Sequence, residues 1–308
     1  MDRQLKDLLD NKNIDDKMLD IIIHNGWLVD GTGNPKHKGD VGIKGDRIVE
    51  VGKLEKAQAV LHIDAAGKIV CPGLIDAHSH TDWTILANPT AESTIRQGVT
   101  TEIVGNCGSS IAPITKNSRI MGSWSLGERT DYSFGEFLEA MKNMGTSNNI
   151  AWLVGHNSIR YCFARHGPNP TEEQMVAMEE ILREAMDAGA VGMSTGLEFE
   201  PGRSCLPQEV MRLAKILKEY DAIYVSHIRN RANMVLEAVD EFLDVIKAYD
   251  IRGEISHMNI RYNTGAPDGA LQKVLEKVED ARRQGFEVLC DMTPLNFGMG
   301  SMAGILPP

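Results

Sequence analysis

Short apolar segments alternate with longer amphipathic segments from about residue 70 onward. The apolar segments are predicted to be β-strands because they are short, rich in Val and Ile, and bounded by Gly, Pro and polar residues. Each is followed by enough residues for a helix, apart from a longer second loop, so the pattern predicts consecutive βα units. The predicted strands are residues 68–78, 99–105, 149–155, 190–196, 222–227, 253–258 and 286–292.

The segments between these strands carry helix signals. Thr171 with Gln174, and Ser133 with Glu136, fit capping boxes, in which a hydroxyl and a later side chain satisfy free N–H groups at a helix start. Apolar residues then recur at helical spacing, which predicts helices with one buried face. The clearest stripes are residues 175–186, 235–246 and 271–281.

The N-terminal part of the chain has a different texture. Residues 1–18 alternate charge and Leu at helical spacing, which predicts a helical extension. Residues 19–70 contain short Val- and Ile-rich runs broken by Gly, Asp and Asn, which favour antiparallel strands with tight turns. We therefore predict a small β-sandwich domain over 19–70, followed by a larger domain over 71–308.

Consecutive βα units form either an open doubly wound sheet or a closed barrel. No GxGxxG pattern follows the first predicted strand. Reactive side chains stand instead at the carboxyl ends of several different strands, where barrel enzymes keep their active sites. We predict an α/β fold, a (β/α)8 TIM-type barrel with a small N-terminal β-domain, and the barrel is incomplete because seven βα units are visible.

Composition and charge limit the classes of molecule that the protein is expected to bind. The 308 residues include 32 Lys and Arg against 43 Asp and Glu, a formal net charge of −11, and no basic run. This balance disfavours nucleic acid and anionic membranes as partners. The five cysteines are odd in number and form no CxxC pair, which favours a reducing cytoplasm, and no apolar run approaches the roughly 18 residues of a membrane span.

Two histidines end the first predicted strand. His78 and His80 are separated by Ser79, and residues i and i+2 of a strand point the same way, so both imidazoles can reach one point. Imidazoles that converge in this way suit a metal of the zinc class. Asp76 and Asp82 share this parity and are candidates to fix a ring tautomer. The alternative is a polar strand end with exposed histidines.

Three further residues occupy matching places on other strands. His227 and His257 each follow a Ser at the end of neighbouring predicted strands, 30 residues apart. Cys107 ends the second strand, between Asn106 and Gly108. A thiolate beside imidazoles is a strong zinc donor, whereas the remaining cysteines fit small buried hydrophobic positions.

These motifs together resemble a known family. The runs PGLIDAHSHTD, GVTTEIVGNCGSSIAP, GHNSIR, AVGMSTGLEFEPG, VSHIRNR and ISHM are similar to those of the N-acyl-D-amino-acid deacylases (D-aminoacylases) of the amidohydrolase superfamily. The resemblance extends from about residue 19 over almost the whole chain, and GNCG is its most specific part. In much of the superfamily a carboxylated lysine bridges two metals, and in this branch a cysteine, here Cys107, takes its place.

The resemblance implies a site and a reaction. Cys107, His227 and His257 would form a tight zinc site, and His78 and His80 a second, weaker position bridged by Cys107. The implied reaction is hydrolysis of the amide bond of an N-acyl-D-amino acid, a small-molecule substrate. Arg229 is a candidate clamp for the substrate carboxylate because a guanidinium binds it bidentately; a surface salt bridge is the alternative.

The sequence departs from the family pattern at three places. The family's general acid and base is an Asp on an eighth strand, and this sequence stops shortly after the seventh, so we expect a missing C-terminal segment or a second chain to complete the barrel. No catalytic residue is assigned for this reason. Asn259 replaces a common Lys, and residues 293–295 read TPL where relatives often read YPY.

Two other functions compete with this prediction. A cyclic amidase related to hydantoinases or dihydroorotases would share the HxH motif and the two later histidines, but it would carry a lysine in place of Cys107. The second alternative is a non-catalytic metal-binding or assembly subunit that needs another chain. The absent Asp favours this alternative, and the sheet edges left open by a seven-unit barrel would invite a partner.

Overall fold

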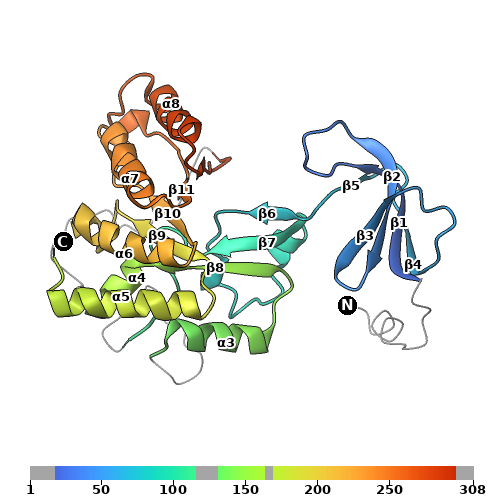
Figure 1. Ribbon diagram of the computed structural model, residues 1–308, viewed down its shortest axis with the longest axis horizontal. Helices are drawn as coiled ribbons and strands as arrows, with labels where there is room; N and C mark the ends of the chain where they lie inside the picture. Colours follow the sequence, from blue (N-terminus) through green and yellow to red (C-terminus); the bar gives the residue numbers. More distant parts are fainter. Residues whose placement is uncertain (1–17, 116–130, 164–168, 296–308) are drawn as a thin grey trace. The chain divides into compact units, whose positions relative to one another are not determined.

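A computed structural model describes residues 18–115, 131–163 and 169–295 (Figure 1). The chain divides into two compact units, residues 1–73 and 74–308. Nearly all of the predicted N-terminal helical extension lies outside the described residues. Within the described part, no helix is both long and apolar enough to cross a membrane.

The first unit is built on one five-stranded sheet. Its strands β1, β2 and β3 pair antiparallel, as predicted, but β4 and β5 pair parallel to β1. The prediction of antiparallel strands is therefore wrong for β4 and β5, and the described residues of this unit form one sheet. Leu19, Ile22 and Leu54 form its small core. The strands are β1 (Leu19–Leu28), β2 (His37–Lys44), β3 (Arg47–Gly52), β4 (Ala59–Asp64) and β5 (Ile69–Val70).

The second unit contains seven parallel strands that are hydrogen-bonded in chain order. All seven predicted strands are present, and the sheet curls into an open barrel. The first differs most from its prediction because the run 68–78 is interrupted at Pro72 and Gly73, so that β5 belongs to the other unit. The strands are β6 (Leu74–Asp76), β7 (Val99–Val104), β8 (Asn149–Gly155), β9 (Gly192–Gly196), β10 (Ile223–His227), β11 (Gly253–Ile255) and β12 (Val288–Cys290).

Helices connect the strands and form the main core with them. Both predicted capping boxes are present, at Ser133 with Glu136 and at Thr171 with Gln174. Neighbouring helices pack on one another, α5 on α6, α6 on α7 and α7 on α8. The helices are α2 (Glu92–Ile95), α3 (Phe134–Met144), α4 (His156–Phe163), α5 (Glu172–Asp187), α6 (Pro207–Glu219), α7 (Val235–Tyr249) and α8 (Ala270–Arg283), with 3-10 turns η1 (Thr81–Trp83), η2 (Gly202–Ser204) and η3 (Tyr262–Thr264).

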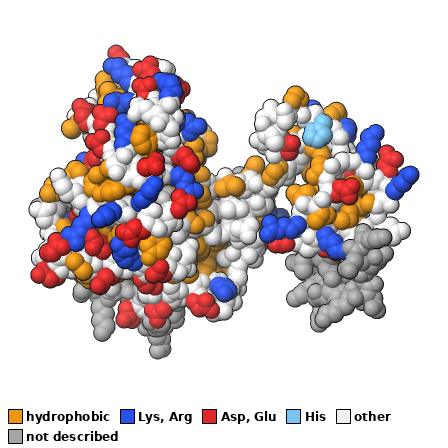
Figure 2. All heavy atoms as spheres, viewed as in Figure 1, with side chains coloured by type: hydrophobic (Ala, Val, Ile, Leu, Met, Phe, Trp, Pro, Cys, Tyr) orange, Lys and Arg blue, Asp and Glu red, His pale blue; other side chains and the backbone are white. Residues whose placement is uncertain are grey.

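The surface of the second unit is mixed in charge. On the face drawn in Figure 2, Lys and Arg side chains are interspersed with Asp and Glu. The two outer strands of the sheet expose apolar side chains, Leu74 and Ile75 on β6 and Leu289 on β12. The carboxyl ends of the parallel strands all lie at one edge of the sheet, and this edge carries the predicted site residues.

Candidate metal centre

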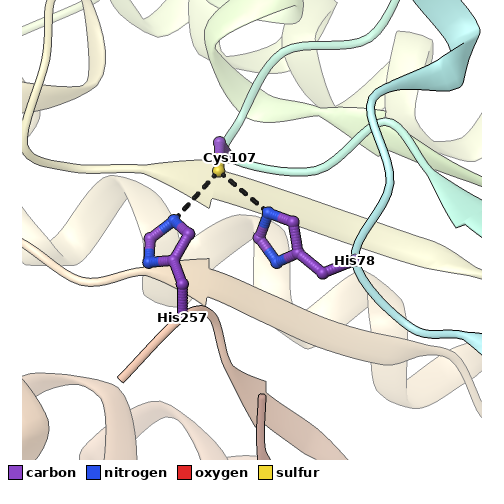
Figure 3. Close-up of side chains that lie close together, drawn as sticks. All are labelled: His78, Cys107 and His257. Carbon is purple, nitrogen blue, oxygen red and sulfur yellow. Dashed lines mark hydrogen bonds between the residues drawn. The ribbon is translucent and has the colours of Figure 1, made fainter. Parts of the chain in front are cut away.

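Three of the predicted ligands converge at the carboxyl edge of the sheet. His78, Cys107 and His257 each offer a ligand atom, and these atoms all lie within 4.8 Å of one another. The Cys107 sulfur lies 3.4 Å from Nε2 of His78 and 3.3 Å from Nε2 of His257 (Figure 3). They follow strands β6, β7 and β11, so strands distant in the sheet contribute to one point.

The loop after β7 holds Cys107 in a tight conformation. Gly105 and Gly108 both have positive φ, and a Cβ at either would lie within 2.5 Å of backbone atoms, 2.1 Å from the Leu153 carbonyl oxygen and 2.4 Å from the Gly196 nitrogen. Cys107 itself has φ 55°, a left-handed conformation that is strained for a residue with a side chain. The glycines of the GNCG motif are therefore required for the thiol to approach the histidines.

Burial raises the pKa of the Cys107 thiol to about 12. Without a cation the sulfur is therefore protonated at neutral pH. A bound metal ion would deprotonate it and take the place of the proton as its partner.

His257, Cys107 and His78 form a chain of hydrogen bonds in which each group donates to the next. Arg231 Nη1 donates to Nδ1 of His257 at 3.0 Å, and since a guanidinium has no acceptor, the ring proton of His257 is on Nε2 and faces the sulfur. The thiol donates in turn to Nε2 of His78, whose Nδ1 donates to Oδ2 of Asp291 at 3.0 Å. A metal held by Cys107 would take the place of the thiol proton, and His257 would offer Nε2 only after its ring proton had moved to Nδ1, the atom that Arg231 now faces.

Asp291 orients the first histidine. Its Oδ2 accepts from Nδ1 of His78, and its Oδ1 accepts from the backbone N–H of His257 at 2.7 Å. The predicted candidates for this role do not fill it: Asp76 accepts from the backbone N–H of His78, and Asp82 is fully buried. Burial raises the pKa of Asp82 to about 7.

His227 lies beside His257, with ring centroids 4.3 Å apart. Its Nε2 donates to Oε2 of Glu198 at 2.7 Å, and its Nδ1 is buried without a hydrogen-bond partner among the described residues. Burial lowers the pKa of His227 to about 4, against the opposing effect of Glu198, so the ring is neutral. The unpartnered Nδ1 lone pair is what a metal ligand requires.

Glu198 accepts hydrogen bonds from three side chains. Besides His227 it accepts from Arg231 Nη2 at 3.0 Å and from Arg261 Nη1 at 2.8 Å. Burial alone would raise the pKa of Glu198, but the hydrogen bond from His227 and the charge of Arg231 lower it to about 2. Glu198 is therefore ionised and fixes the tautomer of His227.

His80 lies close to the converging groups but outside the set of three ligand atoms. Its ring centroid is 5.4 Å from that of His78. Burial and the neighbouring imidazoles His78 and His227 lower the pKa of His80 to about 4. A neutral imidazole here can serve as a ligand, as the HxH pattern predicts.

The residues present fit zinc. A thiol and neutral imidazoles are the donors that zinc prefers, and carboxylates or backbone groups hold the rings of such ligands. His227 leaves Nδ1 unpartnered, and His78 directs its unprotonated Nε2 at the sulfur. The ligand roles themselves remain a prediction.

The guanidinium of Arg229, the predicted carboxylate clamp, is occupied by other protein groups. Its Nε and Nη2 bind the two oxygens of Glu241 at 2.8 and 2.7 Å, and its Nη1 donates to the Arg203 carbonyl at 2.9 Å. All three nitrogens thus have partners, which is the arrangement of the salt-bridge alternative. Arg231, two residues later, is the arginine that reaches the site histidines.

A second buried group contains His156, Cys205 and Glu209. Arg160 occupies both oxygens of Glu209, at 2.7 and 3.0 Å, and His156 Nε2 lies 2.6 Å from Oε1. The adjacent guanidinium already compensates the carboxylate and would repel a cation, so this group stabilises the fold.

The sequence did not reveal Glu198 and Arg231 as site residues. Neither belongs to a recognisable ligand pattern, and each acts through a partner far along the chain, as Glu198 does with Arg261, 63 residues away. Their position within motif-bearing loops after β9 and β10 was the only available signal.

The second unit is a curled parallel sheet with thiol and imidazole groups at its carboxyl edge. This combination is typical of barrel proteins that hold a metal centre. The chain belongs to the amidohydrolase family, whose model matches residues 62–291.

Individual relatives share this fold and sequence. The chain is 38% identical, over 90% of its length, to an N-acyl-D-glutamate deacylase from Alcaligenes xylosoxydans xylosoxydans, of which it covers 57%. An N-acyl-D-glutamate deacylase from Bordetella bronchiseptica, solved with zinc and a phosphonate inhibitor that mimics the tetrahedral intermediate, aligns with TM-score 0.79 and 34% identity, covering 90% of this chain and 59% of that one. A solved D-aminoacylase gives TM-score 0.82 and 30% identity, with the same coverage. The chain thus spans somewhat more than half the length of these relatives.

Proposed function

We propose that the chain takes part in the zinc-dependent hydrolysis of the amide bond of N-acyl-D-amino acids. The observation that carries the proposal is the approach of the Cys107 sulfur to two imidazoles, 3.4 and 3.3 Å away, in a chain similar to named deacylases. Such a substrate is a small molecule with a carboxylate, and we place the reaction in the cytoplasm on the cysteine pattern.

The proposed ligands are Cys107, His227 and His257 for one zinc ion, with His78 and His80 forming a weaker position that shares Cys107. A zinc ion bound there would polarise the amide carbonyl and lower the pKa of water. The chain's own residues prepare the ligands: Glu198 keeps Nδ1 of His227 unprotonated, and Asp291 does the same for Nε2 of His78. No residue is assigned to the general acid and base step.

The test measures metal and activity separately. Purified protein is dialysed against metal-free buffer and analysed for zinc by mass spectrometry, and amine release is then followed with N-acetyl forms of D-glutamate, D-aspartate and D-leucine. The L enantiomers serve as the matched control. We expect zinc to be retained and D substrates alone to react. Absence of retained zinc would refute the metal assignment, and zinc retention without amine release from any D substrate would refute the reaction.

A further inference from the structure

Glu102 on β7 is a fully buried carboxylate whose partners in the described part of the chain are neutral. Ser79 Oγ and Thr81 Oγ1 donate to its Oε1 at 2.7 and 2.5 Å, and Asn148 Nδ2 donates to its Oε2. The Thr94 hydroxyl lies 3.2 Å from Oε2 and shares its proton with the Ala91 carbonyl.

A buried carboxylate destabilises the folded chain unless hydrogen bonds compensate for its loss of water. Burial of a charge costs several kcal/mol, and an apolar side chain of similar volume would fill β7 without that cost. One oxygen of Glu102 accepts from both Ser79 and Thr81, so a single side chain fixes both hydroxyls.

Two of these donors alternate with predicted ligands. Ser79 and Thr81 interleave with His78 and His80, and Ser79 also donates its backbone N–H to the Ile103 carbonyl at 3.0 Å. In Figure 1, β6 and β7 lie side by side, and the histidine segment, residues 78–81, follows shortly after β6. Glu102 thus holds one side of a four-residue segment whose other two members carry the imidazoles.

We propose that Glu102 is a positioning residue for the metal centre, acting through Ser79 and Thr81 on His78 and His80. The inference rests on the proposed function, because it assumes that these imidazoles bind zinc.

The first test is Glu102→Gln in the full chain. Glutamine keeps the volume but has one acceptor oxygen in place of two: its NH2 group either opposes the Asn148 amide nitrogen or reverses the hydrogen bonds of the Ser79 and Thr81 hydroxyls. We expect zinc affinity, measured by competition with a chromophoric chelator, to fall about 10- to 100-fold, as is typical for residues that orient metal ligands. The visible spectrum of the cobalt-substituted protein should change as well, a readout that loss of stability alone would not move.

Two controls separate positioning from general destabilisation. Glu209→Gln disturbs another buried carboxylate, the partner of Arg160 and His156, and should leave zinc affinity unchanged within about twofold. Thr81→Val and Ser79→Ala remove donors on the histidine segment, whereas Thr94→Val removes one outside it. The first two should weaken zinc binding and the third should not, which decides the matter even if Glu102→Gln does not fold.

The outcomes are distinct. Wild-type protein that binds no zinc would overturn the proposed function together with this inference. Wild-type protein that binds zinc, with Glu102→Gln or both donor variants matching it in affinity and cobalt spectrum, would overturn the role of Glu102 alone. Equal losses in Thr94→Val and Thr81→Val would also overturn it, because the effect would then not pass through the histidine segment.

Discussion

His78 and Asp291 are hydrogen-bonded, Nδ1 to Oδ2 at 3.0 Å, although 213 residues separate them. His78 follows β6 and Asp291 follows β12, the two outer strands of the sheet. The carboxyl ends of these strands therefore meet across the open side of the barrel. One carboxylate also caps the backbone N–H of His257, so a single residue orients two predicted ligands.

This relationship predicts the effect of Asp291→Asn. An amide can accept from only one of its two partners, and if its nitrogen faces His78, the ring proton of His78 moves to Nε2, where the sulfur lies. We expect zinc affinity to fall about 10- to 100-fold. Chelator competition measures the fall, and Asp76→Asn is the control because Asp76 accepts from backbone N–H of the same residue. Equal affinities for Asp291→Asn and wild type would contradict the role.

The thiol is predicted to be indispensable for the metal. Cys107→Ser replaces a soft thiolate by a hydroxyl that stays protonated, so zinc affinity should fall by more than about 100-fold. Cys162→Ser is the matched control, since Cys162 is also buried and lies on α4. Dialysis followed by metal analysis checks both variants. Retention of zinc by Cys107→Ser would exclude a cysteine-based centre.

The sequence predicted the strands well because each βα unit carries its own signals. Capping boxes at Ser133 and Thr171 and apolar runs at β7 to β12 depend on neighbouring residues only. The parallel pairing of β4 with β1 was missed because strand direction in a sheet depends on the path of the chain between strands.

The site was predictable by residue type but not by contact. His78, Cys107 and His257 stand at strand ends, which topology alone brings to one edge. The choice between Arg229 and Arg231 depends on the course of a loop: one binds Glu241 on α7 and the other reaches His257. A pattern of neighbouring residues holds no information on such long-range contacts.

Glu198 is predicted to couple stability to metal binding. Glu198→Gln leaves the buried guanidinium of Arg231 without its counter-charge, which should cost about 3 kcal/mol in the free energy of unfolding. The variant also removes the acceptor that holds Nε2–H of His227, so zinc affinity should fall. Urea unfolding and chelator competition measure the two effects. As a control, Glu241→Gln disturbs the ion pair of Arg229 and should affect stability alone.

The pH dependence of the metal-free protein follows from opposing buried groups. Burial lowers the pKa of His80 and His227 to about 4 and that of His257 to about 2. As the pH falls below 6.5, these imidazoles therefore become protonated in the unfolded chain but stay neutral in the folded chain. Burial raises the pKa of Asp82 and Glu254 to about 7, so these carboxyls take up protons in the folded chain as pH falls from 7 and partly compensate.

Three histidines against two carboxyls leave a net excess of about one proton on the unfolded chain between pH 5.5 and 4.5, whereas near pH 6.5 the two effects cancel. The free energy of unfolding should therefore fall by about 1.4 kcal/mol for each unit of acidification in this window. Urea titrations with EDTA at pH 4.5, 5 and 5.5 measure the slope, and a titration at pH 7 gives the reference stability. Asp82→Asn removes one compensating carboxyl, so it should raise stability at pH 7 and steepen the fall toward pH 5. A stability that rises on acidification in the unmodified chain would show that the imidazoles are not buried in neutral form.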